Sequence, residues 1–235
     1  MKVLLGGAFK WFKRILLGLV LLILLTQCWY MGWVMWWKYF DPGMTRFMEI
    51  RLDEARRTNP QAELKRHWQP YGKISVHLKR AVVAAEDDKF AVHDGFDWEG
   101  MQLALEKNRR KGRLVAGGST ITQQLAKNLF LSPVKTPWRK AQEAIITLML
   151  ETAWDKRRIL EVYLNSVEWG DCVFGAEAAA RRYYRVGAAQ LTAAQAARLA
   201  VMLPAPRRFE KNPWSAYLNR RTQTILARMP HAQLP

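Results

Sequence analysis

The stretch RKAQEAIITLMLETAWDKRRILEVYLN, residues 139–165, decides the fold class. Most of its residues are strong helix formers, and its apolar side chains recur at the spacing of one helix face. The residues of that face include Ile146, Leu150, Ile159 and Leu160. The pattern predicts one central helix, or two helices joined near Trp154 and Asp155.

Helical spacing of apolar residues continues on both sides of this stretch, and no segment alternates with period two for long enough to predict a sheet. Thr192 followed by Gln195 is the pattern of a capping box at a helix start. In residues 212–230 we expect Asn212 to cap a helix and Pro213 to take its first position. The predicted fold class is therefore mostly α.

Length and charge limit the functional classes. The chain has 235 residues, enough for one domain with a substantial core, and its 37 Lys and Arg against 20 Asp and Glu give a net charge of +17. This favours an anionic partner: nucleic acid, lipid headgroups or a phosphate-bearing substrate. The two cysteines are badly placed to pair, because Cys28 lies inside a long apolar run and Cys172 far along the chain, so no disulfide framework or cysteine metal site is indicated.

Residues 15–37 contain no charged side chain, and about 20 apolar residues in a helix cross a bilayer. Four basic residues precede them, which predicts a cytoplasmic N-terminus and places the rest of the chain outside the cytoplasm. They are Lys2, Lys10, Lys13 and Arg14. The rival interpretation is a cleavable signal peptide, but its apolar region is normally shorter and ends at small residues, whereas this one ends in a tryptophan-rich cluster.

These features predict four regions: a cytoplasmic N-terminus (1–14), a transmembrane helix (15–37), a connector and membrane-proximal segment (38–79), and a catalytic-size domain (80–235). Within the connector, residues 44–56 could form a short amphipathic helix near the membrane. The basic run at residues 107–113 precedes a glycine pair, and we expect it to be an exposed loop.

The stretch AAEDDKFAVHDGFDW, residues 84–98, places Glu86 at the end of an apolar helical run. Burial there would raise the pKa of its carboxyl group toward the range useful for proton transfer, so Glu86 is a candidate general base. His93 could support the site, and nearby rings could wall it: Phe90, Phe96 and Trp98. The alternative is an acidic patch that caps a helix and binds the domain's own Arg and Lys.

The stretch GGSTITQQLAKN begins at Gly117 and combines a glycine pair with a capping box at Thr120 and Gln123. A helix that starts here would place Thr120, Gln123, Gln124 and Lys127 on one side, near a helix N-terminus suited to anions. The alternative is a plain surface helix with solvated Gln and Lys. Walker and dinucleotide-binding motifs are absent from the sequence.

Glu143 is a second candidate acid, four residues after Arg139 and therefore on the same helix face. Its alternative role is an exposed salt bridge, which contributes little. Lys135, Arg139 and Lys140 make this region basic and suitable for a phosphate group. A zinc site is not expected, because His93 and the aspartates after it lack a third ligand nearby.

Four blocks together carry a resemblance: EDDKFAVHDGFDW, GGSTITQQLAKNLF, RKAQE and KRRILEVYLNSVEWG. In order and spacing, from about residue 74 to 206, they resemble the signature blocks of the peptidoglycan glycosyltransferases that polymerise lipid II. The resemblance implies a lysozyme-like helical fold with a smaller, membrane-apposed lobe. It also implies a monofunctional, single-pass inner-membrane protein whose catalytic domain is periplasmic.

The resemblance implies roles for individual residues. Glu86 would deprotonate the 4-hydroxyl of an acceptor N-acetylglucosamine, and Glu143 would lie near the donor's diphosphate and its metal. Lys127 and Arg139 match donor-site residues, and Lys135 stands where some relatives hold an arginine. The residues expected to line the cleft are Ser119, Thr120, Gln123 and Gln124. Glu161 and Asn165, in the fourth block, are expected to be structural.

The reaction so implied joins lipid II to a growing glycan strand through an inverted β-1,4 bond. Its implied cofactor is a divalent cation, Mg²⁺ or Mn²⁺, with no organic cofactor. Membrane phospholipids and cell-division or elongation proteins are the expected further partners, and nucleic acid is not expected outside the cytoplasm. Two rivals stay open: a lytic muramidase of similar fold and a non-catalytic membrane-anchored scaffold.

Overall fold

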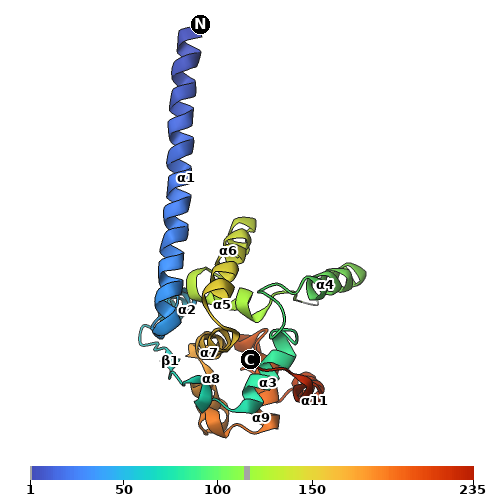
Figure 1. The fold of residues 1–235 in the computed structure, drawn as a ribbon. Helices are drawn as coiled ribbons and strands as arrows, with labels where there is room; N and C mark the ends of the chain where they lie inside the picture. Colours follow the sequence, from blue (N-terminus) through green and yellow to red (C-terminus); the bar gives the residue numbers. More distant parts are fainter. Residues whose placement is uncertain (1, 114–116) are drawn as a thin grey trace. The chain divides into compact units, whose positions relative to one another are not determined.

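A computed structural model of the protein describes residues 2–113 and 117–235 in two compact units (Figure 1). The first unit, residues up to Phe40, is one helix, α1 (Lys2–Tyr39). Within it, Trp11–Tyr39 is long and apolar enough to cross a membrane, with a mean hydropathy of 2.1. The helix extends beyond residues 15–37 at both ends because bilayer thickness limits the apolar span but not the helix.

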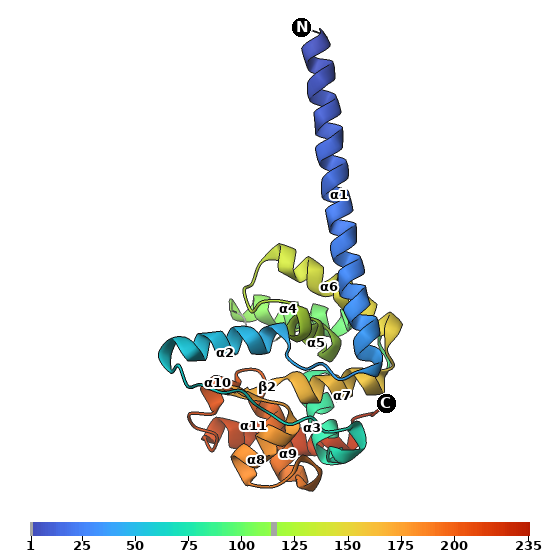
Figure 2. The same ribbon diagram turned by 90° about the vertical axis from the view of Figure 1, so that its left-hand side faces the viewer.

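The second unit, residues 41–235, is mostly helical, which confirms the predicted fold class (Figure 2). Its longer helices are α2 (Arg46–Thr58), α3 (Val76–Glu86), α4 (Trp98–Lys111), α5 (Ile121–Phe130), α6 (Pro137–Ala153), α7 (Lys156–Ser166), α8 (Ala176–Tyr184), α9 (Ala193–Met202) and α11 (Ala216–Arg228). Short helical turns are η1 (Tyr71–Lys73), η2 (Ala188–Gln190), α10 (Pro206–Phe209) and η3 (Met229–His231).

The central stretch is two helices, α6 and α7, which meet at the predicted break. Trp154 ends α6, and the Asp155 carboxylate then accepts a hydrogen bond from the backbone N–H of Arg158 at 2.7 Å. An aspartate that bonds the first turn in this way starts a new helix instead of continuing the old one. The prediction of two joined helices is confirmed.

The core forms where α3 packs against α9, α9 against α11, and α5 against α6 and α7. Its largest fully buried side chains include Tyr163, Trp169 and Phe90. α5 also packs against α2, so it lies at the centre of the second unit's packing, and most of its residues are buried.

A small sheet accompanies the helices, with the order β1 (Lys65–Arg66), β3 (Val173–Phe174), β2 (Glu168–Gly170). β1 is parallel to β3, and β2 is antiparallel to it. Strands of two or three residues are too short to show period-two alternation, which explains why the sequence did not indicate them.

The segment before α3 is tied to α7 by two polar side chains. The Asn165 amide bonds both backbone groups of Gln69, at 2.8 and 2.9 Å, and Glu161 accepts from the backbone N–H of Tyr71 at 2.7 Å. Asn165 is fully buried. The expected structural role of Glu161 and Asn165 is therefore confirmed.

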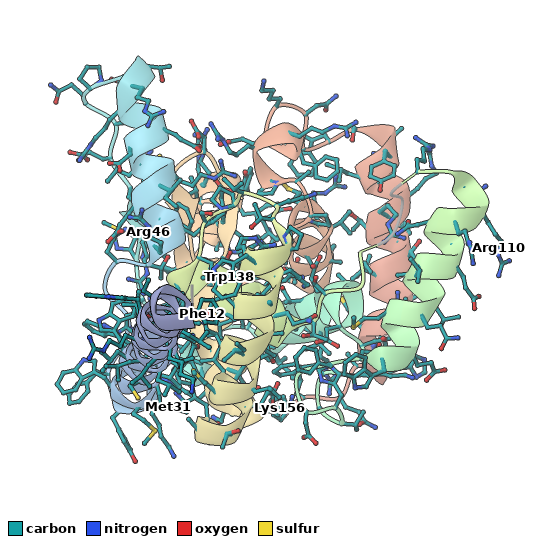
Figure 3. All side chains as sticks on the ribbon, turned by 90° about the horizontal axis from the view of Figure 1, so that it is seen from above. Phe12, Met31, Arg46, Arg110, Trp138 and Lys156 are labelled. Carbon is teal, nitrogen blue, oxygen red and sulfur yellow. The ribbon has the colours of Figure 1, made fainter. Side chains whose placement is uncertain are left out.

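Two local predictions are wrong. Ser215, not Asn212, caps α11, because its hydroxyl accepts from the backbone N–H of Leu218 at 3.4 Å. Pro213 precedes the helix, and its carbonyl accepts from Arg198 of α9 at 2.8 Å. The basic run at residues 107–113 is exposed but mostly helical, since α4 continues to Lys111 before Gly112 adopts a φ of 60°. Figure 3 shows Arg110 on the outer side of α4.

Candidate active site

The end of α3 and the start of α5 are joined by Asp87. One Asp87 oxygen accepts from the backbone N–H of Ile121 at 2.9 Å, and the other lies 2.8 Å from Nε2 of His93. His93 Nδ1 accepts from the backbone N–H of Gly95 at 3.1 Å, so Nε2 carries the ring proton. His93 thus supports the site indirectly, because it holds the side chain of Asp87 in place.

The start of α5 is fixed a second time by Thr120. Its side chain and that of Gln123 form the predicted capping box, and its hydroxyl donates to the carbonyl of Gly95 at 2.7 Å. Gly95 has a φ of 87°, and a Cβ there would lie 2.8 Å from Cγ2 of Thr147. Glycine is required at this position, and α5 begins at a defined place relative to α3.

Glu86, the last residue of α3, faces α5 across a short hydrogen bond. Nε2 of Gln124 donates to its carboxylate at 2.7 Å, and the Tyr163 hydroxyl donates to Oε1 of Gln124 at 2.9 Å. Burial raises the pKa of Glu86, while the bond from Gln124 and the charge of Lys127 act in the opposite direction. The net effect is that the pKa of Glu86 is above its ordinary value.

Glu86 opens into a pocket of about 170 Å³, here called the Glu86 pocket. At its rim Arg228 of α11 pairs with Asp88 at 2.8 Å. The lining residues are Ala84, Ala85, Glu86, Asp87, Asp88, Asp97, Gly100, Gly117, Gly118, Ser119, Thr120 and Arg228. Small residues and carboxylates leave room for a polar, uncharged group beside Glu86.

A second pocket of about 420 Å³, the cationic pocket, adjoins the first. Ser119 lines both pockets, and Gln124, which lines the second, bonds Glu86 in the first. Its charged lining residues are Arg51, Lys127, Lys135, Arg139, Lys140, Glu143 and Glu168. Five basic groups against two acidic ones make it a site for an anion.

Glu143 is one of the two acidic residues that line the cationic pocket, and it is buried, with 3% of the residue exposed. Arg139 donates to one of its oxygens and Lys140 to the other, and Lys140 also donates to the Ser119 hydroxyl at 3.2 Å. Burial lowers the pKa of Lys127, and the charge of Glu143 raises it. Glu143 therefore holds the basic side chains in place rather than facing solvent.

Comparison with known proteins places these residues in a family. A family model described as Transglycosylase matches residues 53–230. The chain belongs to the transglycosylase family. It is 61% identical to the biosynthetic peptidoglycan transglycosylase of Aromatoleum aromaticum over the full length of both chains. It is also 61% identical to the protein of that name from Dechloromonas aromatica, over 96% of this chain and 98% of the relative.

The transglycosylase fold brings most of the predicted residues together. Glu86, Ser119 and Thr120 line the Glu86 pocket, and the cationic pocket takes Ser119, Gln124, Lys127, Lys135, Arg139 and Glu143. Gln123 differs: the described lining of both pockets leaves it out, and it is 2% exposed. Its side chain accepts from the backbone N–H of Thr120, as the predicted capping box requires, and its contact with substrate stays a prediction.

The structure also bears on the alternative role of Glu143 and on the predicted aromatic wall. Glu143 does form ion pairs, with Arg139 and Lys140, but it is buried, so the exposed position given to it in that alternative is wrong. Among the described residues, the lining of the Glu86 pocket does not include the three predicted rings, so the aromatic wall is wrong for that pocket. Phe90 is a fully buried core residue, while Phe96 stacks on the exposed Trp98 at 5.3 Å between ring centroids.

Several lining residues of this transglycosylase were not among the predicted site residues. Lys140 was recognised only as part of a basic region, although it lies three residues before Glu143 on the same helix. Phe47 and Arg51 from α2 and Arg228 from α11 carry no such local signal, because they reach the pockets through contacts between segments that are distant in the sequence. Asn128 and Glu168 lie inside the second and fourth sequence blocks, but nothing in their spacing marked them as lining residues.

The side chains alone do not make a resident site for a divalent cation. In residues 2–113 and 117–235 there is no group of three His, Cys, Asp or Glu that could hold one. Both oxygens of Glu143 are already occupied by Arg139 and Lys140. Mg²⁺ favours oxygen ligands in an octahedral arrangement, so Glu143 as found does not fit the predicted metal role.

Proposed function

We propose that this transglycosylase polymerises lipid II, the lipid-linked disaccharide precursor of peptidoglycan, into β-1,4-linked glycan and releases polyprenyl diphosphate. The names of its relatives support a role in peptidoglycan biosynthesis. The observation that carries the proposal is a single carboxylate, Glu86, in a pocket that shares Ser119 with a cationic pocket. Acyl, phosphoryl or redox chemistry does not need this pairing of groups.

In the proposed reaction, the Glu86 pocket receives the 4-hydroxyl of the acceptor sugar. Glu86 takes the hydroxyl proton as the oxygen attacks the anomeric carbon of the donor, and the bond from that carbon to the diphosphate breaks. One displacement of this kind inverts an α-linked donor to a β-linked product. The raised pKa of Glu86 fits this role, because a buried carboxyl group is a stronger base than a solvated one.

The cationic pocket is proposed to hold the diphosphate of the donor and to stabilise it as it leaves. Lys127 and Lys135 supply positive charge without an ion-pair partner among the described residues. Nε of Arg139 is a buried donor with no hydrogen-bond partner in the described chain, and a phosphate oxygen would satisfy it. Glu143 positions Arg139 and Lys140 for the same purpose.

The excess of cations favours transfer over glycan cleavage. A lytic muramidase requires a well-placed acid, but its substrate carries no diphosphate, so it has no use for five basic side chains beside that acid. A divalent cation, Mg²⁺ or Mn²⁺, is still proposed as a companion of the bound diphosphate, which could provide most of its oxygen ligands. No organic cofactor is proposed.

Contact with phospholipid is proposed for α4 and α6, which lie at the same end of the second unit in Figures 1 and 2. Large apolar side chains are exposed on or beside them: Trp98, Leu103, Leu105, Val134, Trp138, Ile145 and Leu148. An exposed set of this size indicates a membrane or protein contact. By contrast, two apolar residues of α2, Phe47 and Met48, are buried against Phe174.

The proposed cellular location is the bacterial inner membrane, with α1 as a single-pass anchor, the N-terminus in the cytoplasm and the catalytic domain in the periplasm. The apolar span Trp11–Tyr39 and the basic residues that precede or begin it support this orientation. Anchoring would hold both pockets close to the lipid that carries the substrate. Cell-division or elongation proteins are proposed as further partners.

The test uses the full chain in phospholipid vesicles with labelled lipid II, and separately with finished, lipid-free glycan. We expect polymer from the first substrate and no soluble fragments from the second. Fragments without polymer would show a muramidase, and inactivity on both would favour a scaffold. A parallel sample with a chelator tests the divalent cation, because loss of polymer that Mg²⁺ or Mn²⁺ restores would establish it.

A further inference from the structure

A chain of hydrogen bonds links three helices behind the Glu86 pocket. Tyr163 of α7 donates to Oε1 of Gln124 on α5 at 2.9 Å, and Nε2 of the same amide donates to Glu86 on α3 at 2.7 Å. Tyr163 is fully buried. Its hydroxyl therefore acts on the pocket through Gln124 and does not reach the substrate itself.

The direction of each bond follows from the chemistry of the three groups. An ionised carboxylate only accepts, so the Gln124 amide must turn its NH₂ toward Glu86 and its oxygen toward Tyr163. Tyr163 must then donate. Burial, together with the nearby charges of Glu86 and Asp87, raises the pKa of Tyr163 well above its usual range, so the hydroxyl keeps the proton that it donates.

We propose that Tyr163 is a positioning residue: by binding the carbonyl oxygen of Gln124, it keeps the amide NH₂ on Glu86 and so favours the ionised, proton-accepting form of that carboxyl group. The proposal rests on the proposed role of Glu86 as the general base. Without the hydroxyl, the Gln124 amide can turn over and offer its oxygen to a protonated Glu86. That arrangement stabilises the neutral acid, which cannot accept a proton.

Other charged groups act on Glu86, and the Tyr163 hydroxyl bonds none of them. Lys127 on α5 and Arg221 on α11 favour the ionised form, and Asp87 disfavours it. Asp87 is itself held by His93 and by the start of α5. If removal of the Tyr163 hydroxyl changes the titration of Glu86, the change therefore comes through the orientation of the Gln124 amide.

The test is the pH profile of kcat/KM for polymerisation by full-length Tyr163→Phe, whose acid limb reports the pKa of the base in the free enzyme. Because the hydrogen bond from Gln124 to the ionised Glu86 would be lost, we expect the limb to move up by roughly one to two pH units. Tyr163→Phe should lose about tenfold or more in kcat/KM at pH values below the acid limb and little on the plateau above it. Rates that fall equally at every pH would overturn the proposal.

The matched control is Tyr183→Phe. The Tyr183 hydroxyl donates to the backbone carbonyl of Trp169 at 2.8 Å, so this variant loses a comparable bond that does not involve Gln124. Its acid limb should stay at the wild-type pH. An equal shift in both variants would overturn the proposal, because the shift would then be a general effect of lost stability.

A second variant keeps the proposal testable should Tyr163→Phe fold poorly. Gln124→Met preserves the length of the side chain but not its donor, so it should shift the acid limb in the same direction, and adding Tyr163→Phe to it should shift the limb no further. Additive shifts would show that Tyr163 does not act through Gln124 and would overturn the proposal. Failure of the proposed function is separate: it would appear as polymerisation by Glu86→Gln, whatever the tyrosine variants do.

Discussion

Glu168, at the start of β2, is a buried acid at the wall of the cationic pocket. Burial raises its pKa to about 7, although the charges of Arg51 and Arg207 act to lower it. One oxygen lies 3.4 Å from Nε of Arg51, and the other has no hydrogen-bond partner in the described chain. The folded protein therefore binds a proton here that the unfolded chain releases at lower pH.

The sign of the resulting pH dependence follows from that difference. The folded pKa of about 7 is above the ordinary value of 4.5, so the contribution to stability is present below pH 4.5 and is lost as the pH rises to about 7. Glu168→Gln should therefore gain stability relative to wild type across this window, by up to roughly 3 kcal/mol. Urea unfolding of both proteins at pH 5 and pH 8 measures this gain in the free energy of unfolding. A gain that is the same at both pH values would contradict the assignment.

At the scale of the helix, α5 organises the site because it carries Gln124 and Lys127 and begins two residues after Ser119. Its start could be predicted because a capping box is a local pattern, and the same holds for α9. The break at Trp154 and Asp155 is local too. The Ser215 cap and the short strands depended on contacts with distant segments, and the sequence carried no signal for them.

The two capping boxes provide a matched pair of variants. Thr120→Ala and Thr192→Ala each remove an N-cap whose glutamine partner lies three residues later, and each should lower the free energy of unfolding by about 1 kcal/mol. Thr120→Ala should cost more, because its hydroxyl also donates to Gly95. Only Thr120→Ala should reduce polymerisation in folded protein. Equal activity of the two variants would show that the start of α5 does not position the site.

At the scale of the whole second unit, the pockets collect side chains from Phe47 on α2 to Arg228 on α11. Most of the predicted lining residues lie in the four sequence blocks, which were recognisable by order and spacing, although Asn128 and Glu168 in the same blocks were missed. The contributions of α2 and α11 could not be predicted, since which faces of these helices meet α5 and α3 is decided only by the packed fold.

The exposed apolar residues of α4 and α6 give a prediction at this scale. Trp138 is 69% exposed, and Trp138→Ser should leave the free energy of unfolding nearly unchanged. Burial of one such side chain in lipid contributes roughly 1.5–3 kcal/mol, so polymerisation of lipid II in vesicles should fall about tenfold. Activity on a short-chain, water-soluble donor and acceptor should be retained.

The control for this variant is Val76→Ser, which removes an exposed apolar side chain from α3, outside the proposed lipid contact. It should behave as wild type with both substrates. Equal losses for Trp138→Ser with vesicles and with the soluble substrate would indicate damage to the site instead of loss of a membrane contact.

The most direct test of the central claim is polymer formation by full-length Glu86→Gln, compared with Glu106→Gln on the exposed surface of α4. Loss of a general base costs roughly 10²–10⁴-fold in rate, so we expect at least a hundredfold slower chain growth with lipid II binding preserved. Glu106→Gln should match wild type. Chain growth by Glu86→Gln at a rate near that of wild type would contradict the account.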